Sequence, residues 1–390
     1  MLFTRNHGDV ECTARPARMA GQSMRTRETK EPEPLREKKL MSTYLITGIA
    51  GFIGSSLARA VLQRGDRVRG IDNFSTGKPE NIAEIIDQID FREADLLDLE
   101  ATQQACRDVD YVLHEAAIPS VPRSINKPLE TNRANVDGTL NLLIAARDAK
   151  VRRVVYAASS SAYGETPTLP KSEDMAPSPI SPYAVSKLAG EHYMQSFWRS
   201  YGLETVCLRY FNVFGPRQDP RSPYSGVLAK FITQMLGRER PVIFGDGRQS
   251  RDFTYVDNVV QANLLACKAP AKDVVGKVFN VAGGRRIDLN EMYSVLQNLT
   301  GFLASAEYGP PRQGDVKHSL ADLTRVEKYL GYQPTVSFEE GLRQTVEWYR
   351  TVEVESRELI VSGKFASLPL FVTAVVNASI RAASRIKARV

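Results

Sequence analysis

Short apolar runs alternate with longer segments of helical periodicity between residues 43 and 212. Ser55–Arg64, Thr139–Ala149 and Pro182–Tyr201 have the spacing of helices that pack one face against a core. The runs between them predict strands, at Tyr44–Thr47, Arg67–Ile71, Tyr111–His114, Val154–Ala157 and Thr205–Arg209. This alternation of strands and helices predicts a parallel, doubly wound α/β sheet, with ligands at the carboxyl ends of its strands.

The pattern becomes irregular after Gly215, where proline and glycine are frequent. Val278–Val281 predicts one further strand and Leu289–Leu299 one further helix. We therefore expect a sheet domain over residues 41–215 and a smaller α/β lobe over residues 216–350, with some of its segments returning to the sheet.

The two ends of the chain differ from the part between them. Residues 1–40 are rich in Arg, Lys, Glu, Thr and Pro and contain no apolar run, which predicts a disordered basic extension and no secretory signal. Met41 is a second candidate for the start of the protein. Residues 351–390 predict a helical tail, and its apolar run Ala366–Ile380 is short for a membrane span. Packing on a protein surface is favoured for this run, and contact with a membrane interface is the alternative.

Composition limits the classes of function. The chain has 390 residues, of which 43% are hydrophobic and 25% charged, as in ordinary globular proteins. Much of its net charge of +6 comes from the two ends, which argues against a nucleic-acid-binding face. The four cysteines are far apart and show no CxxC spacing, so we expect reduced thiols and a cytoplasmic protein. His114 and His318 have no partner at ligand spacing, and no metal site is predicted.

A glycine-rich turn follows the first predicted strand. It reads Gly48-Ile49-Ala50-Gly51-Phe52-Ile53-Gly54 and leads into a helix. Glycines let the backbone approach a pyrophosphate closely, and the helix N-terminus adds N–H groups and a favourable dipole. Asp72 ends the second strand, where a carboxylate binds the adenosine ribose and repels the 2′-phosphate of NADP. The sequence therefore predicts NAD as the cofactor.

Tyr183 and Lys187 lie four residues apart, so they share a face at the start of a predicted helix. Ser181-Pro182 before them is typical of an N-cap and a first helical residue. A lysine ammonium beside the phenol, or a positive nicotinamide ring, would lower the tyrosine pKa and make Tyr183 a usable acid–base group. The serines of residues 159–164, SSSAYG, offer a hydroxyl that could share the reacting oxygen of a substrate.

These motifs together resemble the extended short-chain dehydrogenase/reductases of the NAD-dependent epimerase/dehydratase family, which includes the UDP-glucose 4-epimerases. The resemblance rests on the glycine turn, Asp72, SSSAYG, SPYAVSK (181–187), RYFN (209–212), GDG (245–247), RDFTYVD (251–257) and RQGDV (312–316), and it runs from about Met41 to Tyr349. It implies a Rossmann-like sheet with a UDP-sugar-binding lobe. The segment Ile118–Ser124 most resembles the branch that interconverts UDP-N-acetylglucosamine and UDP-N-acetylgalactosamine, although Pro119 stands where that branch has a small flexible residue.

The resemblance also implies a role for each matching residue. The cofactor is expected on Gly48, Gly51, Phe52, Ile53, Gly54, Asp72, Asn73, Asp95, Leu96, Ala116, Ala117, Asn135, Tyr183, Lys187 and Tyr210. Ser159 takes the catalytic serine position, Tyr183 is the base and Lys187 its partner on the nicotinamide ribose. The UDP-sugar is expected on Ser120, Ser160, Asn212, Arg251, Arg312, Asp315 and Ser319. By family analogy the protein is expected to be a homodimer.

The implied reaction is inversion at C4 of a UDP-hexose through a 4-keto intermediate. The resemblance places Ser319 beside C2 of the sugar, where a small residue leaves room for an acetamido group, and this favours UDP-N-acetylglucosamine and its galacto epimer, with UDP-glucose also accepted. Dehydratases and UDP-glucuronate decarboxylases of the family usually carry a carboxylate before the Tyr-Gly of the serine segment, where this chain has Ser160, Ser161 and Ala162. UDP-glucuronate 4-epimerase remains an alternative. A non-catalytic NAD-binding scaffold is disfavoured, because such proteins typically lose the Tyr–Lys pair.

Overall fold

Seven parallel strands form the main sheet of the computed structural model, which describes residues 11, 13, 41–220, 226–311 and 317–361. Their spatial order is β11-β6-β5-β4-β1-β2-β3. The strands are β1 (Thr43–Thr47), β2 (Arg67–Asp72), β3 (Asp90–Glu93), β4 (Tyr111–His114), β5 (Arg153–Ser159), β6 (Glu204–Tyr210) and β11 (Lys277–Val281). This is the predicted Rossmann-like α/β fold, and the strand order reverses between β1 and β4, where such sheets bind ligands.

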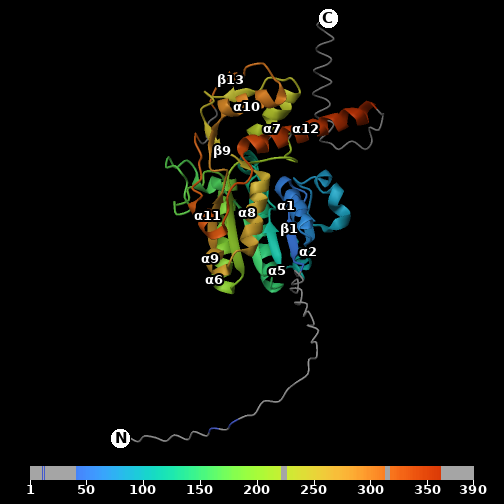
Figure 1. Cartoon of the computed structure of the whole chain (residues 1–390), viewed down its shortest axis with the longest axis vertical. Helices are drawn as coiled ribbons and strands as arrows, with labels where there is room; N and C mark the ends of the chain where they lie inside the picture. Colours follow the sequence, from blue (N-terminus) through green and yellow to red (C-terminus); the bar gives the residue numbers. More distant parts are fainter. Residues whose placement is uncertain (1–10, 12, 14–40, 221–225, 312–316, 362–390) are drawn as a thin grey trace. The chain divides into compact units, whose positions relative to one another are not determined.

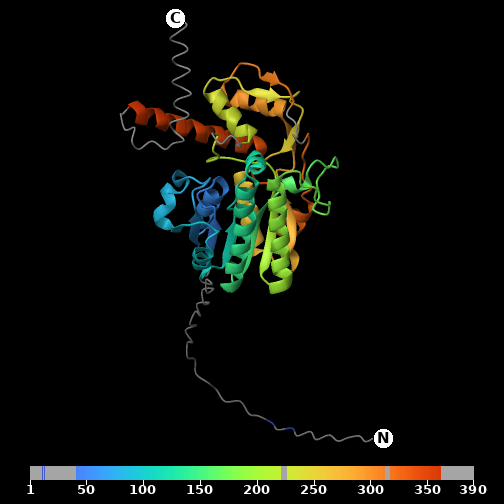
Figure 2. The same cartoon turned by 180° about the vertical axis from the view of Figure 1, so that it is seen from behind.

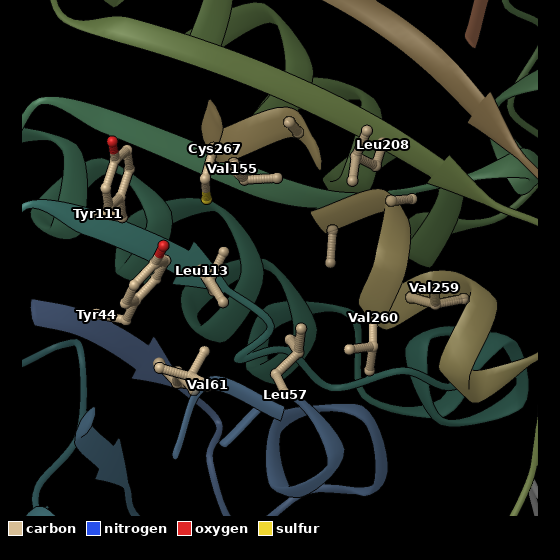
Figure 3. Close-up of a cluster of buried hydrophobic side chains, with 14 of the residues drawn as sticks. Tyr44, Leu57, Val61, Tyr111, Leu113, Val155, Leu208, Val259, Val260 and Cys267 are labelled. Atoms are coloured by element: carbon tan, nitrogen blue, oxygen red, sulfur yellow. The ribbon is translucent and has the colours of Figure 1, made fainter. Parts of the chain in front are cut away.

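Helices cover both faces of this sheet (Figures 1 and 2). One layer consists of α1 (Phe52–Gln63), α8 (Val256–Lys268) and α11 (Thr324–Leu330), and the other of α2 (Leu99–Cys106), α5 (Gly138–Asp148) and α6 (Pro182–Tyr201). Figure 3 shows the first layer's core, where Leu57 and Val61 of α1 and Val260 of α8 lie over strand residues such as Leu113 and Val155. A sheet buried on both faces needs apolar residues along whole strands, which is why the predicted strands are continuous apolar runs.

Helix α6 has the bounds that the sequence predicts. The Ser181 side chain accepts a hydrogen bond from the Ala184 N–H, and Pro182 is the first helical residue. The helix ends at Gly202, whose φ of 72° is left-handed and suits glycine. Helix α1 begins at Phe52, three residues before the predicted Ser55, because Gly51 of the glycine turn is itself its N-cap.

A second group of elements lies at one end of the main sheet (Figures 1 and 2). It contains the helices α7 (Val227–Leu236), α10 (Leu289–Thr300) and α12 (Phe338–Val361). Its strands pair as β7 (Val213–Phe214) with β10 (Thr254–Tyr255), β9 (Ser250–Asp252) with β12 (Arg286–Asp288), and β8 (Val242–Phe244) with β13 (Glu307–Gly309). Phe214 is the centre of its core, with ring centroids of Tyr255 and Phe338 both 5.6 Å away.

Shorter helical turns complete the part of the chain that the structure describes. They are α3 (Val121–Asn126), α4 (Pro128–Asn132), α9 (Ala271–Val274), η1 (Pro79–Asn81), η2 (Ala83–Gln88), η3 (Arg133–Asp137) and η4 (Ser160–Tyr163). Across the described ranges, no helix combines the length and the apolar character needed to cross a membrane. The expectations for residues 1–40 and for Ala366–Ile380 fall outside the described residues, apart from residues 11 and 13, and stay predictions.

Candidate active site

A cleft of about 1380 Å³ opens at the carboxyl ends of the central strands. Almost all of the residues that the sequence predicts for cofactor and substrate line it, although they come from segments far apart in the chain. These are Gly48, Gly51, Phe52, Ile53, Gly54, Asp72, Asn73, Asp95, Leu96, Ala116, Ala117, Ser120, Ser159, Ser160, Tyr183, Lys187, Tyr210, Asn212, Arg251 and Ser319. Arg312 and Asp315 lie outside the described residues.

The glycine turn is shaped so that no side chain could fill it. Gly48 has a φ of 68°, and its carbonyl accepts from the Gly51 N–H at 2.9 Å. A Cβ on Gly54 would lie 2.2 Å from the Gly48 oxygen, so any larger residue would force the turn apart. No side chain caps the first turn of α1, whose backbone N–H groups therefore lie at the cleft wall. This geometry fits a pyrophosphate at the helix N-terminus.

Asp72 forms the part of the cleft wall next to the glycine turn. Its two carboxylate oxygens accept from the Ala50 N–H at 2.9 Å and from the Phe74 N–H at 2.8 Å. Burial raises the pKa of Asp72, and these backbone hydrogen bonds counter that shift. The carboxylate is thus fixed against the glycine turn, and each oxygen keeps a second lone pair for a ribose hydroxyl. The turn and Asp72 fit a dinucleotide cofactor.

Asn73 and Asp95, both expected at the adenosine, are joined to each other. The Asn73 amide donates to the Asp95 carboxylate at 2.7 Å, and the other Asp95 oxygen accepts from the Leu97 N–H at 2.9 Å. The two residues thereby connect the ends of β2 and β3 at this side of the cleft.

Ser159 hydrogen-bonds the Tyr183 hydroxyl at the centre of the cleft. The Ser159 Oγ itself accepts from the Ser161 hydroxyl at 2.8 Å and from the Ser161 N–H at 3.2 Å. Because both of these partners donate to Ser159, its own proton is left to point toward Tyr183 or a substrate oxygen. Ser161 is therefore part of the site, a role that the sequence alone did not assign to it.

Lys187 lies deeper than Tyr183 and is anchored at the end of β5. Its ammonium donates to the Ala157 carbonyl at 2.9 Å and lies 5.0 Å from the centre of the Tyr156 ring. Burial lowers the pKa of Lys187, while Glu115 and Glu191 raise it. In the chain alone, burial raises the pKa of Tyr183, although the Ser159 hydrogen bond lowers it. The expected lowering of the Tyr183 pKa therefore needs positive charge beyond this chain's own.

One predicted residue, Asn135, supports the cleft wall from behind. Asn135 is buried, and its amide oxygen accepts from the Ile118 N–H at 2.8 Å while its nitrogen donates to the Ser186 Oγ at 3.0 Å. Asn135 therefore fixes the loop at Ile118, which lines the cleft. Asn135 itself does not line the cleft, because its side chain is hydrogen-bonded to Ile118 and Ser186.

Neither histidine considered for a metal has metal-site surroundings. The His114 ring bonds the hydroxyls of Thr47 at 2.8 Å and Thr139 at 2.9 Å. Burial lowers the pKa of His114 to about 3, so its ring is neutral. His318 bonds the Ser250 hydroxyl at 2.9 Å. Among the described residues, no group of three or more His, Cys, Asp or Glu side chains could hold a metal ion.

The substrate end of the cleft is built where β9 meets the segment after residue 316. Ser319 Oγ accepts from the Asp252 N–H at 3.3 Å and from the Asn212 amide at 3.4 Å. Arg251 Nη1 donates to the Ser250 carbonyl at 3.0 Å, which holds its side chain beside them. The predicted residues Asn212, Arg251 and Ser319 are thus brought together from three separate segments.

A second cavity of about 470 Å³ continues from this end, with Asn212 and Arg251 in the walls of both. Its other lining side chains are mainly apolar and include Phe231, Phe244 and Phe253. An apolar, aromatic cavity next to an arginine suits a flat base that is joined to phosphates.

Glu115 is the most consequential residue that sequence reasoning missed. It follows β4 directly and lines the cleft, as Asp72 does at the end of β2. The signal that indicates Glu115 is a polar residue at the carboxyl end of a parallel strand, the same signal that indicates Asp72.

Comparison with known proteins gives consistent results. The model of the NAD dependent epimerase/dehydratase family matches residues 44–282. A UDP-glucose 4-epimerase of Mycolicibacterium smegmatis is 41% identical over 310 residues, which cover 78% of this chain and 98% of that protein.

Two solved structures illustrate the structural likeness. A UDP-N-acetylglucosamine 4-epimerase of Methanobrevibacter ruminantium, in complex with UDP-N-acetylmuramic acid, has a TM-score of 0.76 and 40% identity, covering 80% of this chain and 99% of that chain. A UDP-glucuronic acid 4-epimerase of Bacillus cereus, in complex with UDP-glucuronic acid and NAD, has a TM-score of 0.73 and 34% identity, with coverage of 80% and 99%. The similarity thus extends over almost the whole length of each relative.

Proposed function

We infer that this chain, which belongs to the NAD-dependent epimerase/dehydratase family, is an NAD-dependent enzyme that inverts C4 of a UDP-bound hexose. For its substrates we propose UDP-N-acetylglucosamine and UDP-N-acetylgalactosamine, with UDP-glucose and UDP-galactose also accepted. The observation that carries this choice is the small side chain of Ser319 in the cleft wall, beside Asn212.

The cofactor in this proposal is held by the glycine turn and by Asp72. Bound NAD supplies a hydride acceptor and donor for C4. The chain orients it through the N-terminus of α1 and excludes NADP, because the Asp72 carboxylate would repel a 2′-phosphate. Asn73 and Asp95 hold the adenosine side of the site.

Tyr183 moves the proton. As the general base it takes the proton of the sugar 4-hydroxyl, and it returns that proton when the alcohol re-forms. Ser159 donates a hydrogen bond that fixes the oxygen geometry, because Ser161 occupies its acceptor side. The Lys187 ammonium, anchored on the Ala157 carbonyl in the cleft wall, is placed to bind the nicotinamide ribose, and the positive nicotinamide ring would supply the charge that lowers the Tyr183 pKa.

The UDP would be held apart from the reacting sugar. Arg251 is placed to pair with the diphosphate, while the aromatic cavity around Phe244 is placed to take the uracil ring. Holding the UDP at this distance leaves the 4-keto sugar free to turn over between the two hydride transfers, which is what inversion at C4 requires.

UDP-glucuronate is the second candidate. The relative from Bacillus cereus acts on it, and two cationic side chains, Arg123 and Lys171, line the cleft here. Both already have partners: Arg123 pairs with Glu130, and Lys171 donates to the Thr166 carbonyl. A C6 carboxylate would have to compete with these contacts, which favours the neutral sugars.

The test is incubation of the purified enzyme with UDP-N-acetylglucosamine, UDP-glucose and UDP-glucuronate separately. The C4 configuration of each product is then determined by proton NMR. We expect turnover of UDP-N-acetylglucosamine to be the fastest. Turnover of UDP-glucuronate alone would contradict the proposal and would select the second candidate.

A further inference from the structure

Asp252 on β9 carries a buried carboxylate directly behind the substrate end of the cleft. The preceding residue, Arg251, lines the cleft, and successive side chains of a strand point to opposite faces. The Asp252 side chain therefore points away from the cleft, into the protein. A buried carboxylate is costly unless hydrogen bonds replace the water that it loses. The partners of this carboxylate show which segments it holds together.

A pair of glycines wraps one oxygen of the carboxylate. The N–H groups of Gly283 and Gly284, in the turn between β11 and β12, both donate to Asp252 Oδ1 at 3.0 Å. Gly284 has a left-handed φ of 78°, and a Cβ on Gly283 would lie 2.4 Å from the carbonyl oxygen of Phe253. Neither position accepts a larger side chain without strain. The turn thus presents two consecutive N–H groups to a negatively charged oxygen.

The second oxygen of the carboxylate holds the segment that carries Ser319. Asp252 Oδ2 accepts from the N–H of Ala321, two residues after Ser319, at 3.1 Å. On the cleft side, the Asp252 N–H donates to Ser319 Oγ at 3.3 Å, and the Asp252 carbonyl accepts from the Asn212 amide at 3.0 Å. The Ser319 N–H also donates to the Ser250 carbonyl of β9 at 3.0 Å. The segment of residues 319–321 is therefore fixed to β9 at both of its ends.

Both oxygens of Asp252 are needed for these contacts. Burial raises the pKa of Asp252 to about 7, while the N–H groups of Ala321, Gly284 and Gly283 lower it. An asparagine of the same shape would avoid the cost of burying a charge, but it has one oxygen and would present N–H groups in place of the other. Only a carboxylate accepts from the glycine pair and from Ala321 at the same time.

We propose that Asp252 is a positioning residue for the substrate, whose carboxylate holds residues 319–321 against β9 so that Ser319 and Arg251 meet the UDP-sugar at a fixed separation. The proposal rests on the proposed function, which assigns these two residues to the substrate. Without the contact to Oδ2, residues 319–321 lose one of their two attachments to β9. The glycine turn of residues 48–54, which is assigned to the cofactor, lies between β1 and α1 and does not depend on this contact.

The test replaces Asp252 by asparagine in the NAD-loaded enzyme. The asparagine oxygen can keep the two glycine N–H groups, and its amide nitrogen then faces the Ala321 N–H, where donor meets donor. Binding of UDP is measured by calorimetry at about pH 8.5, above the pKa of Asp252, so that the wild-type carboxylate is ionised. UDP binding needs no turnover, so its result is independent of the reaction assigned to the enzyme.

We expect the Kd for UDP to rise about tenfold, the order of effect of a lost hydrogen bond to a charged acceptor. The amount of NAD bound to the purified enzyme should stay at the wild-type level. An unchanged Kd for UDP would overturn the proposal. Loss of NAD together with the loss of UDP binding would also overturn it, because the defect would then extend to the whole site.

Turnover gives the second readout. Tyr183 and Ser159 lie on other elements, so Asp252→Asn should raise KM for the UDP-sugar about tenfold and lower kcat by less than about threefold. A merely structural defect would reduce the active fraction, and so kcat, without moving KM. Asp288→Asn is the matched control, because Asp288 caps α10 by accepting from the Glu291 N–H at 2.8 Å and asparagine caps equally well. It should change neither constant. A fall of kcat alone in Asp252→Asn would contradict the proposal.

Ala321→Pro keeps the proposal testable if the asparagine variant does not fold. Proline has no N–H, so the donor to Asp252 Oδ2 is lost while the carboxylate and the glycine pair are unchanged. The Kd for UDP should rise as in Asp252→Asn. Where both variants fold, their effects should not add in the double variant, because both remove the same contact. Additive effects, or an unchanged Kd in Ala321→Pro, would overturn the proposal.

Discussion

Asp72→Asn tests two separate contributions of Asp72, one to the stability of the fold and one to the preference for NAD over NADP. Both carboxylate oxygens of Asp72 accept backbone N–H groups, from Ala50 and from Phe74. An asparagine has one oxygen, so its amide nitrogen must face one of these N–H groups, and a buried donor loses its acceptor. A hydrogen bond to a charged acceptor contributes about 1.5–3 kcal/mol. Removing the desolvated charge of Asp72 offsets part of this loss.

We therefore expect the free energy of unfolding to fall by about 1–2 kcal/mol. A stability loss of 1 kcal/mol lowers Tm by roughly 2–4 °C in proteins of about 150–250 residues. We therefore expect the Tm of the variant to fall by roughly 2–8 °C. The discrimination between NAD and NADP should also weaken, by about tenfold or more, because the charge that repels the 2′-phosphate is gone. Thermal unfolding of the variant and binding titrations with each cofactor measure the two effects.

Asp98→Asn is the matched control for this experiment. Asp98 caps α2 by accepting from the Ala101 N–H at 3.0 Å, and asparagine caps a helix as well as aspartate does. It should change Tm and cofactor preference little. The reasoning is refuted if Asp72→Asn unfolds at the wild-type temperature, or if it discriminates between NAD and NADP as strongly as the wild type.

Three further predictions concern the base, the sugar gate and the buried ion pair. Tyr183→Phe should lower kcat by about 100-fold or more, the loss expected for a general base, with the Kd for the UDP-sugar changed little; a variant that keeps more than roughly a tenth of the rate would show that Tyr183 is not the base. Ser319→Tyr should fill the space beside C2 of the sugar and lower kcat/KM for UDP-N-acetylglucosamine while sparing UDP-glucose. Ser319→Ala should spare both substrates. Equal losses on the two sugars would show that Ser319 does not control which sugar is accepted. Glu191→Gln leaves the buried Arg209 without its counter-charge, which costs about 3–5 kcal/mol and should lower Tm by roughly 6–20 °C. An unchanged Tm would contradict this account of the pair.

Local signals made much of the fold predictable. The bounds of α6 follow from Ser181-Pro182 at one end and Gly202 at the other, which cap the helix through bonds within a few residues. The glycine turn and Asp72 are likewise close in sequence and are placed by two adjacent strands. The strands of the sheet could be found because burial on both faces requires uninterrupted apolar runs.

Contacts between distant segments account for what was missed. Glu115 receives its hydrogen bond from Tyr210, 95 residues along the chain, and no spacing rule connects the two. The Lys187 ammonium donates to the Ala157 carbonyl at the end of β5, a partner that the spacing of Tyr183 and Lys187 does not indicate. Which groups surround a buried charge depends on the packing of α6 against β5, and periodicity along the sequence does not specify that packing.

Oxidation and re-reduction at C4 within one site is the central claim, and an isotope measurement tests it directly. UDP-N-acetylglucosamine carrying deuterium at C4 is incubated with the enzyme in ordinary water, and the galacto product is analysed by mass spectrometry and proton NMR. We predict that the deuterium is retained at C4 of the inverted product, because the hydrogen leaves and returns as hydride inside the cleft. Loss of the deuterium to solvent, or a product not inverted at C4, would contradict the account.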